Sequence, residues 1–421
     1  MGGFKIERCK TFPLNNGSPL SRGHERLLLL LLAAVQFTHA LDFMVMLPLG
    51  PKLMRELAIS PVIFTGLISL YSLFSGLVGF FVTGYIDRYE RRQLLLLSYA
   101  GFIIGTLACA LSHSLLTLAV SRSICGAFGG ICGSMVMTTA SDIVPPQRRA
   151  AGLSLVSTSF SISLAGGIPL GLYLANRFNW EAPFWFIGIL SILNFGLILQ
   201  FLPSMRAHIS PTRQGGFAQV LMVVKDSNAR RALTFSGSLV FAHFTIIPML
   251  APYLIANTGF SETRLFAFYC IGGILSLMTT PIIGLLADRF GRFRVYIVLV
   301  SVATFITFGL THAEQIPLWA VIPLGAAFFV FGSGRFIPVQ AICSLAIQPS
   351  QRGAFMSLNS CSRDLMAGLT STFGGWMITT SPQGTLSGYD FLGWLAIAAA
   401  LISLWIGAGV RNVEPNRPLP H

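Results

Sequence analysis

Twelve apolar runs, most of them about 20 residues or longer, follow one another along this chain of 421 residues. A bilayer span needs roughly 20 apolar residues, so these runs are long enough to cross a membrane. Only helices or a closed barrel can satisfy their backbone polar groups in lipid, and the runs lack the alternation of polar and apolar positions that a barrel requires. The sequence therefore predicts an all-α membrane protein with twelve transmembrane helices, at residues 27–49, 62–86, 94–112, 115–142, 152–175, 182–203, 232–256, 264–286, 295–312, 318–347, 353–379 and 390–410.

The composition agrees with this prediction. Hydrophobic residues make up 53% of the chain and charged residues only 10%, whereas a soluble domain carries roughly 25% charged residues. The net charge of +13 would suggest nucleic acid in a soluble protein, but here the basic residues lie in short loops, so no nucleic-acid partner is expected. The seven cysteines show no CxxC and no repeated spacing, which predicts apolar packing roles and no metal site.

The first run has an alternative interpretation as a secretory signal. Arg22 and Arg26 precede an apolar stretch, and Thr38-His39-Ala40 resembles a cleavage site. Cleavage would leave an odd number of spans and would destroy the internal symmetry described below, so we interpret the run as the first transmembrane helix.

The positions of the basic residues predict the orientation in the membrane. With the N-terminus placed inside, 21 of the 28 Lys and Arg residues fall in inside loops and tails, 4 in outside loops and 3 within spans. Basic residues are enriched in cytoplasmic loops. Both termini are therefore expected in the cytoplasm of a multi-pass plasma membrane protein, which points to a bacterial inner membrane.

The longest loop divides the chain into two similar halves. Thr83–Arg92 after the second span matches Gly284–Phe293 after the eighth, and Pro146–Ala150 matches Ser350–Ala354 at an offset of 204. At the same offset Phe37, His39 and Pro48 match Phe241, His243 and Pro252. Repeats of six parallel helices are the architecture of a large class of secondary transporters. The predicted domains are an N-terminal cytoplasmic tail (1–26), an N-terminal six-helix bundle (27–203), a cytoplasmic linker (204–231), a C-terminal six-helix bundle (232–410) and a C-terminal tail (411–421).

With these features the chain resembles a major facilitator superfamily transporter over residues 27–410, and it is most similar to the drug:proton antiporter and arabinose-efflux-permease-like branch. The family's loop motif G-x-x-x-D-R-x-G-R-R/K follows the second span, where Thr83 and Glu90 replace its glycines. The first copy keeps Asp87, Arg88, Arg91 and Arg92, and the second copy keeps Gly284, Asp288, Arg289, Gly291 and Arg292. The resemblance implies that these charges form a cytoplasmic latch that holds the outward-facing state; alternatively, they only set the topology.

Two further motifs lie inside spans. Arg122 followed by Gly126 resembles the family's R-x-x-x-G motif in span four, and Gly167-Ile-Pro-Leu-Gly171 resembles the antiporter motif G-P-x-x-G-G with one extra residue. The glycines allow close helix packing. Pro169 is expected to kink span five, so Gly167, Pro169 and Gly171 are candidate packing or hinge residues.

Ionisable residues inside a span are costly and mark functional sites by default. Asp42 is the candidate proton carrier, because a carboxyl in a partly dehydrated cavity can exchange a proton near neutral pH. The alternative is a permanently charged structural pair between Asp42 and Arg122, which lie at similar depth. His39 and His243 are related by the repeat and lie near mid-membrane, where they could line the substrate path and couple protonation to transport; alternatively, each is bonded to a backbone carbonyl.

Arg335 breaks the repeat, since Ile131 stands at the matching position. A guanidinium offers a rigid fork of donors for a carboxylate or phosphate, so Arg335 is a candidate substrate ligand, with neutralisation by Asp364 as the alternative. The Arg363-Asp364 pair lies near the middle of span eleven. The spans carry Arg122, Arg335 and Arg363 against Asp42 and Asp364, a net charge of +1 that favours an anionic or zwitterionic substrate.

These observations predict a secondary transporter that moves a small organic solute, such as a carboxylate metabolite or siderophore, by alternating access, with export by proton antiport. Import by proton symport and multidrug efflux are the alternatives. The chain contains no G-x-x-x-x-G-K-[ST] for a primary pump and no HExxH for a metalloenzyme. We expect no catalytic residue, no cofactor and no metal. The expected partners are the substrate, protons and the bilayer, around a monomer.

Overall fold

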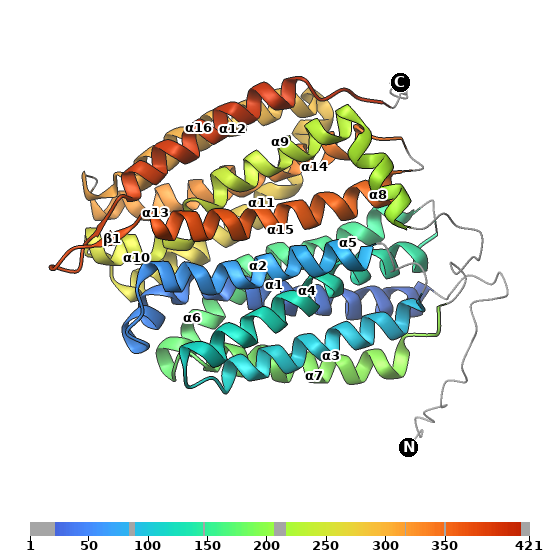
Figure 1. Cartoon of the computed structure of the whole chain (residues 1–421), viewed down its shortest axis with the longest axis horizontal. Coiled ribbons are helices and arrows are strands. Elements are labelled where there is room, and N and C mark those ends of the chain that lie inside the picture. The colour runs from blue at the N-terminus through green and yellow to red at the C-terminus, as the bar shows by residue number, and fades with distance from the viewer. Residues whose placement is uncertain are drawn as a thin grey trace, which may run out of the picture.

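The computed structural model describes residues 22–83, 89–145, 148–205, 216–315, 317–348 and 351–413. Helices dominate it (Figure 1). The first part of the chain forms α1 (Arg22–Glu56), α2 (Pro61–Thr83), α3 (Arg91–Ala110), α4 (Leu115–Ile143), α5 (Arg149–Ile162) continued by the π-helix η3 (Ser163–Gly167) and α6 (Ile168–Arg177), and α7 (Ala182–Phe201).

The second part of the chain adds α8 (Gly216–Lys225), α9 (Ser227–Phe244), α10 (Ile247–Thr258), α11 (Glu262–Phe290), α12 (Arg292–Thr311), the short 3-10 helix η4 (Ala313–Gln315), α13 (Leu318–Ala327), the π-helix η5 (Phe328–Ser333), α14 (Phe336–Leu345), α15 (Arg352–Trp376) and α16 (Tyr389–Ala408). Between α15 and α16, the strands β1 (Thr379–Thr380) and β2 (Leu386–Ser387) pair antiparallel, with Thr379 opposite Ser387.

Eleven helical segments of the described chain are long and apolar enough to cross a membrane. The predicted eleventh span corresponds to α15, which is 25 residues long but less apolar, because polar residues such as Asn359, Arg363 and Asp364 interrupt it. It packs along α2 and α9, and polar residues on a face that meets neighbouring helices need not contact lipid. With α15 counted, the number of long helices agrees with the prediction.

Most helix boundaries lie within a few residues of the prediction, and the largest differences are in the first and seventh spans. The first helix begins at Arg22, before residue 27, and continues through Pro48 and Pro51 to Glu56. The seventh begins at Ser227, before residue 232, where Asp226 caps it by accepting a hydrogen bond from the Ala229 amide. Caps and charged first turns extend a helix beyond its apolar run, which a hydropathy window does not detect. The division of the chain at 204–231 stays a prediction.

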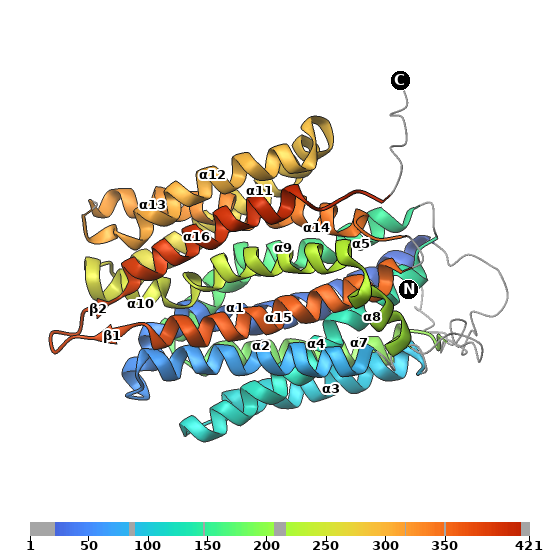
Figure 2. The ribbon, with the colours of Figure 1, turned by 45° about the horizontal axis from the view of Figure 1, so that its top comes forward.

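The helices form two side-by-side groups, α1–α7 and α9–α16 (Figures 1 and 2). We call the end of the bundle where α1 begins and α16 ends the termini end, and the opposite end, which carries β1 and β2, the hairpin end (Figure 1). The helix α8 lies at the termini end, beside α15 and α9.

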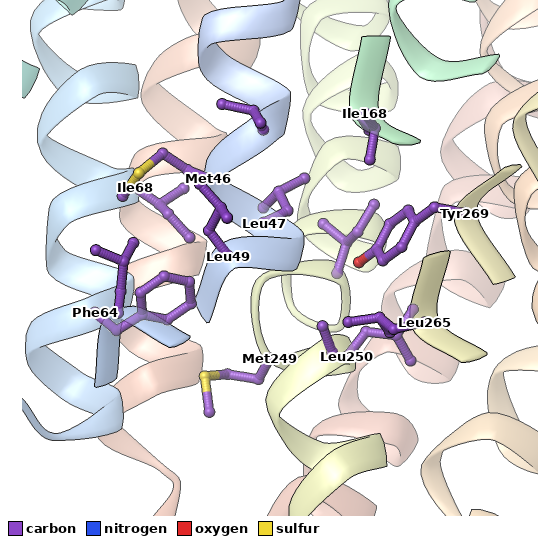
Figure 3. Packing of buried hydrophobic residues seen from close by; sticks show 14 of the residues in the cluster. Met46, Leu47, Leu49, Phe64, Ile68, Ile168, Met249, Leu250, Leu265 and Tyr269 are labelled. Atoms are coloured by element: carbon purple, nitrogen blue, oxygen red, sulfur yellow. The ribbon is translucent and has the colours of Figure 1, made fainter. Parts of the chain in front are cut away.

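The buried apolar residues form one core at the hairpin end and two at the termini end. The hairpin-end core joins both groups of helices and includes the second half of α1, the first half of α2, and α10 and α11. The two termini-end cores each consist of buried residues from one group alone. Figure 3 shows the shared core, with Met46, Leu47, Leu49, Phe64 and Ile68 on one side and Met249, Leu250, Leu265 and Tyr269 on the other. The two halves are therefore held together most extensively at the hairpin end.

Two close seams join the halves. Along α2 and α15, a Cβ added at Gly76 would lie 2.8 Å from the Cys361 carbonyl oxygen. At the other seam, a Cβ at Gly273 of α11 would lie 2.5 Å from the Ala165 Cα in η3. Such distances are shorter than real Cβ contacts, so these glycines are required for the approach of the backbones.

The irregular part of span five lies just before Pro169, where η3 replaces regular helix. A π-helix next to a proline accommodates the missing N–H. Gly167 and Gly171 pack on α1, because a Cβ at Gly167 would lie 2.7 Å from Leu41 and Gly171 faces Val45. Their contacts are therefore packing contacts within the N-terminal half, and a hinge role remains a prediction.

Candidate functional site

A fully buried ion pair lies in the N-terminal half between α1 and α4. The Arg122 guanidinium donates to Asp42 Oδ2 at 2.8 Å, and neither side chain is exposed. The other carboxylate oxygen accepts a hydrogen bond from the Thr106 hydroxyl at 3.2 Å. The Arg122 guanidinium also lies 4.5 Å from the centre of the Tyr71 ring, a cation–π contact. The structure thus brings Asp42 and Arg122 together as the sequence suggested, and it adds Tyr71 to them.

A second cluster lies next to this pair. His39 and Gln36 of α1 and Tyr71 of α2 face the glycines of α4, since a Cβ at Gly129 would lie 2.7 Å from the Tyr71 hydroxyl and 3.0 Å from His39 Nε2. Both ring nitrogens of His39, the Gln36 Oε1 and the Tyr71 hydroxyl are buried and have no hydrogen-bond partner among the residues that the structure describes. His39 is therefore not bonded to a backbone carbonyl.

In the C-terminal half, His243 lies among aromatic rings. Its ring stacks on Phe328 with centroids 5.4 Å apart, and it meets Phe336 edge-on at 5.5 Å. Its Nδ1 is buried without a partner, so this histidine is not bonded to a carbonyl through that atom. The two histidines stand at matching positions of the repeat, and His243 has more aromatic rings around it than His39.

Arg335 is 2% exposed and donates from Nε to the Gly332 carbonyl at 3.1 Å. Among the described residues, no carboxylate forms an ion pair with it. The predicted alternative, neutralisation by Asp364, does not occur in this conformation, because Asp364 accepts a hydrogen bond from Ser75 at 2.7 Å.

The Asp364 contact crosses between the halves, from α15 to α2. Its neighbour Arg363 instead faces α14, where it donates to Gln340 at 3.3 Å and lies 5.1 Å from the centre of the Phe336 ring. The Arg363–Gln340 contact is exposed, although Arg363 stands near the middle of α15. The face of the C-terminal half that carries this contact is therefore accessible from outside the protein.

Aromatic side chains close the space between the two histidines toward the hairpin end. Phe43 of α1 lies 5.2 Å from Tyr71 and 6.0 Å from Phe244, which belongs to the other half. Phe244 in turn lies 5.7 Å from His243. These rings join the two clusters across the interface, on the side where the shared apolar core begins.

An exposed ion pair links the halves at the hairpin end. Arg55 at the end of α1 donates to Glu262 at the start of α11 at 2.9 Å. Next to β1 and β2, a cavity of about 440 Å³ opens between the ends of α10, α12 and α16, lined by residues that include Tyr253, Glu314 and Asp390. None of the predicted site residues lines this cavity.

Part of the first loop motif falls outside the described residues, namely Asp87 and Arg88. Arg91 forms an ion pair with Asp142 of α4 at 3.3 Å, and Arg92 donates to a carbonyl of α7 at 2.7 Å. Both contacts lie within the N-terminal half, at its termini end.

The second copy of the motif also makes local contacts. Asp288 pairs with Arg292 one turn on at 3.7 Å, and its side chain is 72% exposed. The Arg289 guanidinium lies 5.3 Å from the centre of the Phe290 ring. In this conformation, none of these contacts joins the two halves of the described chain.

Sequence reasoning missed Gln36, Tyr71, Ser75 and Gln340. All four are neutral polar residues inside apolar runs, where neither a formal charge nor an imidazole distinguishes them from packing residues. Within the described residues, no group of three or more His, Cys, Asp and Glu could hold a metal ion, and the six described cysteines form no disulfide bond with one another.

Comparisons with known proteins identify the family. Residues 32–371 match the model of the Major Facilitator Superfamily. The MFS-type transporter YfhI of Bacillus subtilis (strain 168) is 27% identical over 359 residues, which cover 80% of this chain and 81% of that protein. YwfA of the same organism is 24% identical over 403 residues, covering 92% and 93% of the two chains.

Solved structures show the same fold. A bacterial homologue of the human lysosomal transporter Spinster, in an inward-facing and occupied conformation, matches with a TM-score of 0.73 at 15% identity, covering 92% of this chain and 97% of that chain. The human organic anion transporter MFSD10 (TETRAN) matches with a TM-score of 0.70 at 18% identity, covering 91% and 99%. The chain is thus a multi-pass membrane protein that belongs to the Major Facilitator Superfamily, a family of transporters and not of enzymes.

Proposed function

We propose that this protein exports a small organic anion or zwitterion by proton antiport. The observation that carries the proposal is the pair of guanidinium groups in the C-terminal half, Arg335 and Arg363. Neither forms an ion pair with a carboxylate among the described residues. Arg363 lies over the Phe336 ring beside His243, and Arg335 donates to the carbonyl of Gly332, a residue that faces His243.

The balance of charge supports an anion. Asp42 and Arg122 neutralise each other, and Asp364 is held by Ser75 of the opposite half. The remaining positive charge lies with Arg335 and Arg363, which a carboxylate could meet through two parallel hydrogen bonds. A lipophilic cation would meet repulsion there.

The rings beside these guanidinium groups suggest the rest of the substrate. Phe328 and Phe336 enclose His243, and Phe336 lies under Arg363, so a planar or apolar body fits next to the anionic group. Asp364 could receive an amine of a zwitterion. The name of MFSD10, an organic anion transporter with the same fold, agrees with this class. A carboxylate metabolite or a siderophore has the required chemistry.

The proposed proton carrier is Asp42, with Arg122 as its counter-ion. The other titratable groups around the Asp42–Arg122 pair are Tyr71, Cys109 and Cys125. Because neither side chain of the pair is exposed in this conformation, Asp42 exchanges its proton in another state of the cycle, in which water reaches the carboxyl group. His39, on the same helix, is the second proposed proton-coupling residue.

The proposed cycle rocks the N-terminal bundle (27–203) against the C-terminal bundle (232–410) about a central site. The positive-inside pattern supports placing both termini in the cytoplasm of a bacterial inner membrane, and the shared core at the hairpin end then supports an inward-facing state. Asp87 and Arg88, with Arg91 and Arg92, act as the cytoplasmic latch in the outward-facing state.

The partly matching loop and span-five motifs support the drug:proton antiporter and arabinose-efflux-permease-like branch. Proton symport of a nutrient and multidrug efflux remain the alternatives to proton antiport of an anion.

Transport in proteoliposomes tests the proposal. Vesicles with an imposed pH gradient of either sign are offered radiolabelled carboxylates, zwitterions, neutral solutes and cationic dyes. We expect a carboxylate or zwitterion to accumulate against its gradient only when protons run the other way, and Arg335→Gln to abolish this. Accumulation with protons running in the same direction would identify a symporter. Transport of cationic dyes alone, with anions neither carried nor competing, would refute the proposed substrate class.

A further inference from the structure

Three side chains of the N-terminal half lie together and carry polar atoms without hydrogen-bond partners among the described residues. Gln36 and His39 come from successive turns of α1, and Tyr71 comes from α2. Four of their polar atoms are buried and make no hydrogen bond. Tyr71 is only 3% exposed. Buried polar groups in native proteins are almost always bonded, and each exception requires an explanation.

The surroundings explain why these atoms stay unpaired within the protein. The opposing wall is α4, which has glycine at positions 129 and 133 and therefore offers no side chain to bond with. A Cβ at Gly129 would lie within 3.0 Å of both Tyr71 and His39, and a Cβ at Gly133 would lie 3.9 Å from Gln36 Oε1. The glycines therefore let the α4 backbone lie close to these polar groups without presenting a side chain that could bond to them.

The position of Tyr71 is fixed from its other side. The Arg122 guanidinium lies over the face of its ring, and Arg122 is held by Asp42. Phe43 packs against the ring as well. A hydroxyl held in place by such contacts, yet without a partner, is ready to bond an incoming group without reorganisation.

We infer that Gln36, His39 and Tyr71 form a second subsite, which binds an uncharged group that both donates and accepts hydrogen bonds, such as a hydroxyl or an amide. A neutral imidazole and a phenol each offer a donor and an acceptor, and the Gln36 oxygen accepts. The subsite rests on the proposed function in one respect, since its ligand is the same solute whose anionic group binds Arg335 and Arg363. The substrate thus carries an anionic end and a neutral polar end, separated by an apolar body that packs beside the contacting rings of Phe43 and Phe244.

The first test needs no ligand. The thermal midpoint of the purified protein in detergent is measured for Tyr71→Phe and for Tyr99→Phe, a matched control whose hydroxyl is bonded to Thr38 at 3.1 Å and Asn194 at 3.4 Å. Removing a buried hydroxyl that has no hydrogen bond removes the free-energy cost of its burial, whereas removing a hydrogen-bonded hydroxyl loses a stabilising interaction. We expect Tyr71→Phe to keep or raise the midpoint and Tyr99→Phe to lower it. A fall in Tyr71→Phe as large as that in Tyr99→Phe would make Tyr71 a structural residue and overturn the inference.

The second test uses matched solutes: benzoate with 4-hydroxybenzoate, and 4-biphenylcarboxylate with its 4′-hydroxy derivative. Binding is measured by the shift of the thermal midpoint with concentration. We expect the hydroxylated member of at least one pair to bind about three- to tenfold more tightly, the worth of one neutral hydrogen bond, and Tyr71→Phe to remove the difference. A preference that survives in Tyr71→Phe, or its absence from the wild type although the carboxylates bind, would contradict the subsite.

A glycine variant provides a control that removes no polar group. Gly129→Ala places a methyl group against Tyr71 and His39 and should abolish the preference for the hydroxylated solute, whereas Gly166→Ala, with open space around its Cβ, should not. If no carboxylate binds the wild type at all, the proposed anionic substrate fails, and the comparison of Tyr71→Phe with Tyr99→Phe still decides the subsite.

Discussion

Substitution of Asp42 separates two roles for the buried ion pair. Asp42→Asn leaves the Arg122 guanidinium without a counter-charge in a place where neither side chain is exposed. Removing one partner of a buried pair costs about 3–5 kcal/mol, a large share of the roughly 5–15 kcal/mol that stabilises a typical folded protein. We therefore expect Asp42→Asn to lower strongly the midpoint of unfolding in a denaturant titration of the detergent-solubilised protein.

A matched control is the pair between Arg55 and Glu262, which has a similar length of 2.9 Å but side chains that are 61% and 38% exposed. Exposed pairs contribute about 0.2–1 kcal/mol, so Glu262→Gln should change the free energy of unfolding little. If Asp42→Asn and Glu262→Gln were equally mild, the argument from burial would be wrong.

The double variant Asp42→Asn with Arg122→Gln then tests the proton-carrier role. Removing both charges leaves no uncompensated ion, and buried pairs replaced together are often neutral in stability. We expect the double variant to recover most of the lost stability but not the accumulation of substrate driven by a pH gradient in proteoliposomes. Recovery of gradient-driven accumulation as well would show that the pair is only structural.

Three further predictions follow from the geometry of the site and the seams. Arg335→Lys should keep the charge but lower the uptake of organic anions at least tenfold in proteoliposomes, because lysine lacks the planar fork of donors; normal uptake would contradict anion binding there. Ser75→Ala removes a 2.7 Å hydrogen bond to Asp364 between the halves, which contributes about 1.5–3 kcal/mol if the carboxylate is charged. The α2–α15 seam should therefore open faster, as measured by the rate of cysteine cross-linking; an unchanged rate would show that this bond does not hold the seam closed. Gly273→Ala should reduce both the transport rate and the yield of purified protein more than Gly196→Ala does, because a Cβ at Gly196 has no atom within 4 Å. Equal effects of the two variants would exclude the close approach of Gly273 to η3.

Much of the fold follows from hydropathy, because lipid forces each span to be a long helix. The pairing of Asp42 with Arg122 was also within reach of sequence reasoning, since counting residues from the ends of spans one and four places both at similar depth. The 1.5 Å rise per residue makes depth readable along a helix.

The rotation of each helix about its axis is not readable in the same way. Whether Arg335 meets Asp364 or the Gly332 carbonyl, and whether Asp364 faces Arg335 or Ser75, depends on how the halves pack. Tyr71 escaped notice for a second reason, since a tyrosine in an apolar run is ordinarily a packing residue. Only the absence of partners around its hydroxyl singles it out.

The most direct test of the central claim measures both ends of the bundle at once. Spin labels at Ser60 and Thr263 report the distance between the halves at the hairpin end, and labels at Gln93 and Arg294 report it at the termini end, by double electron–electron resonance in lipid nanodiscs. Alternating access predicts opposite changes between pH 5 and pH 8 or on addition of a transported anion, with one distance growing as the other shrinks. Two distances that stay fixed, or that grow and shrink together, would contradict rocking of two bundles about a shared central site.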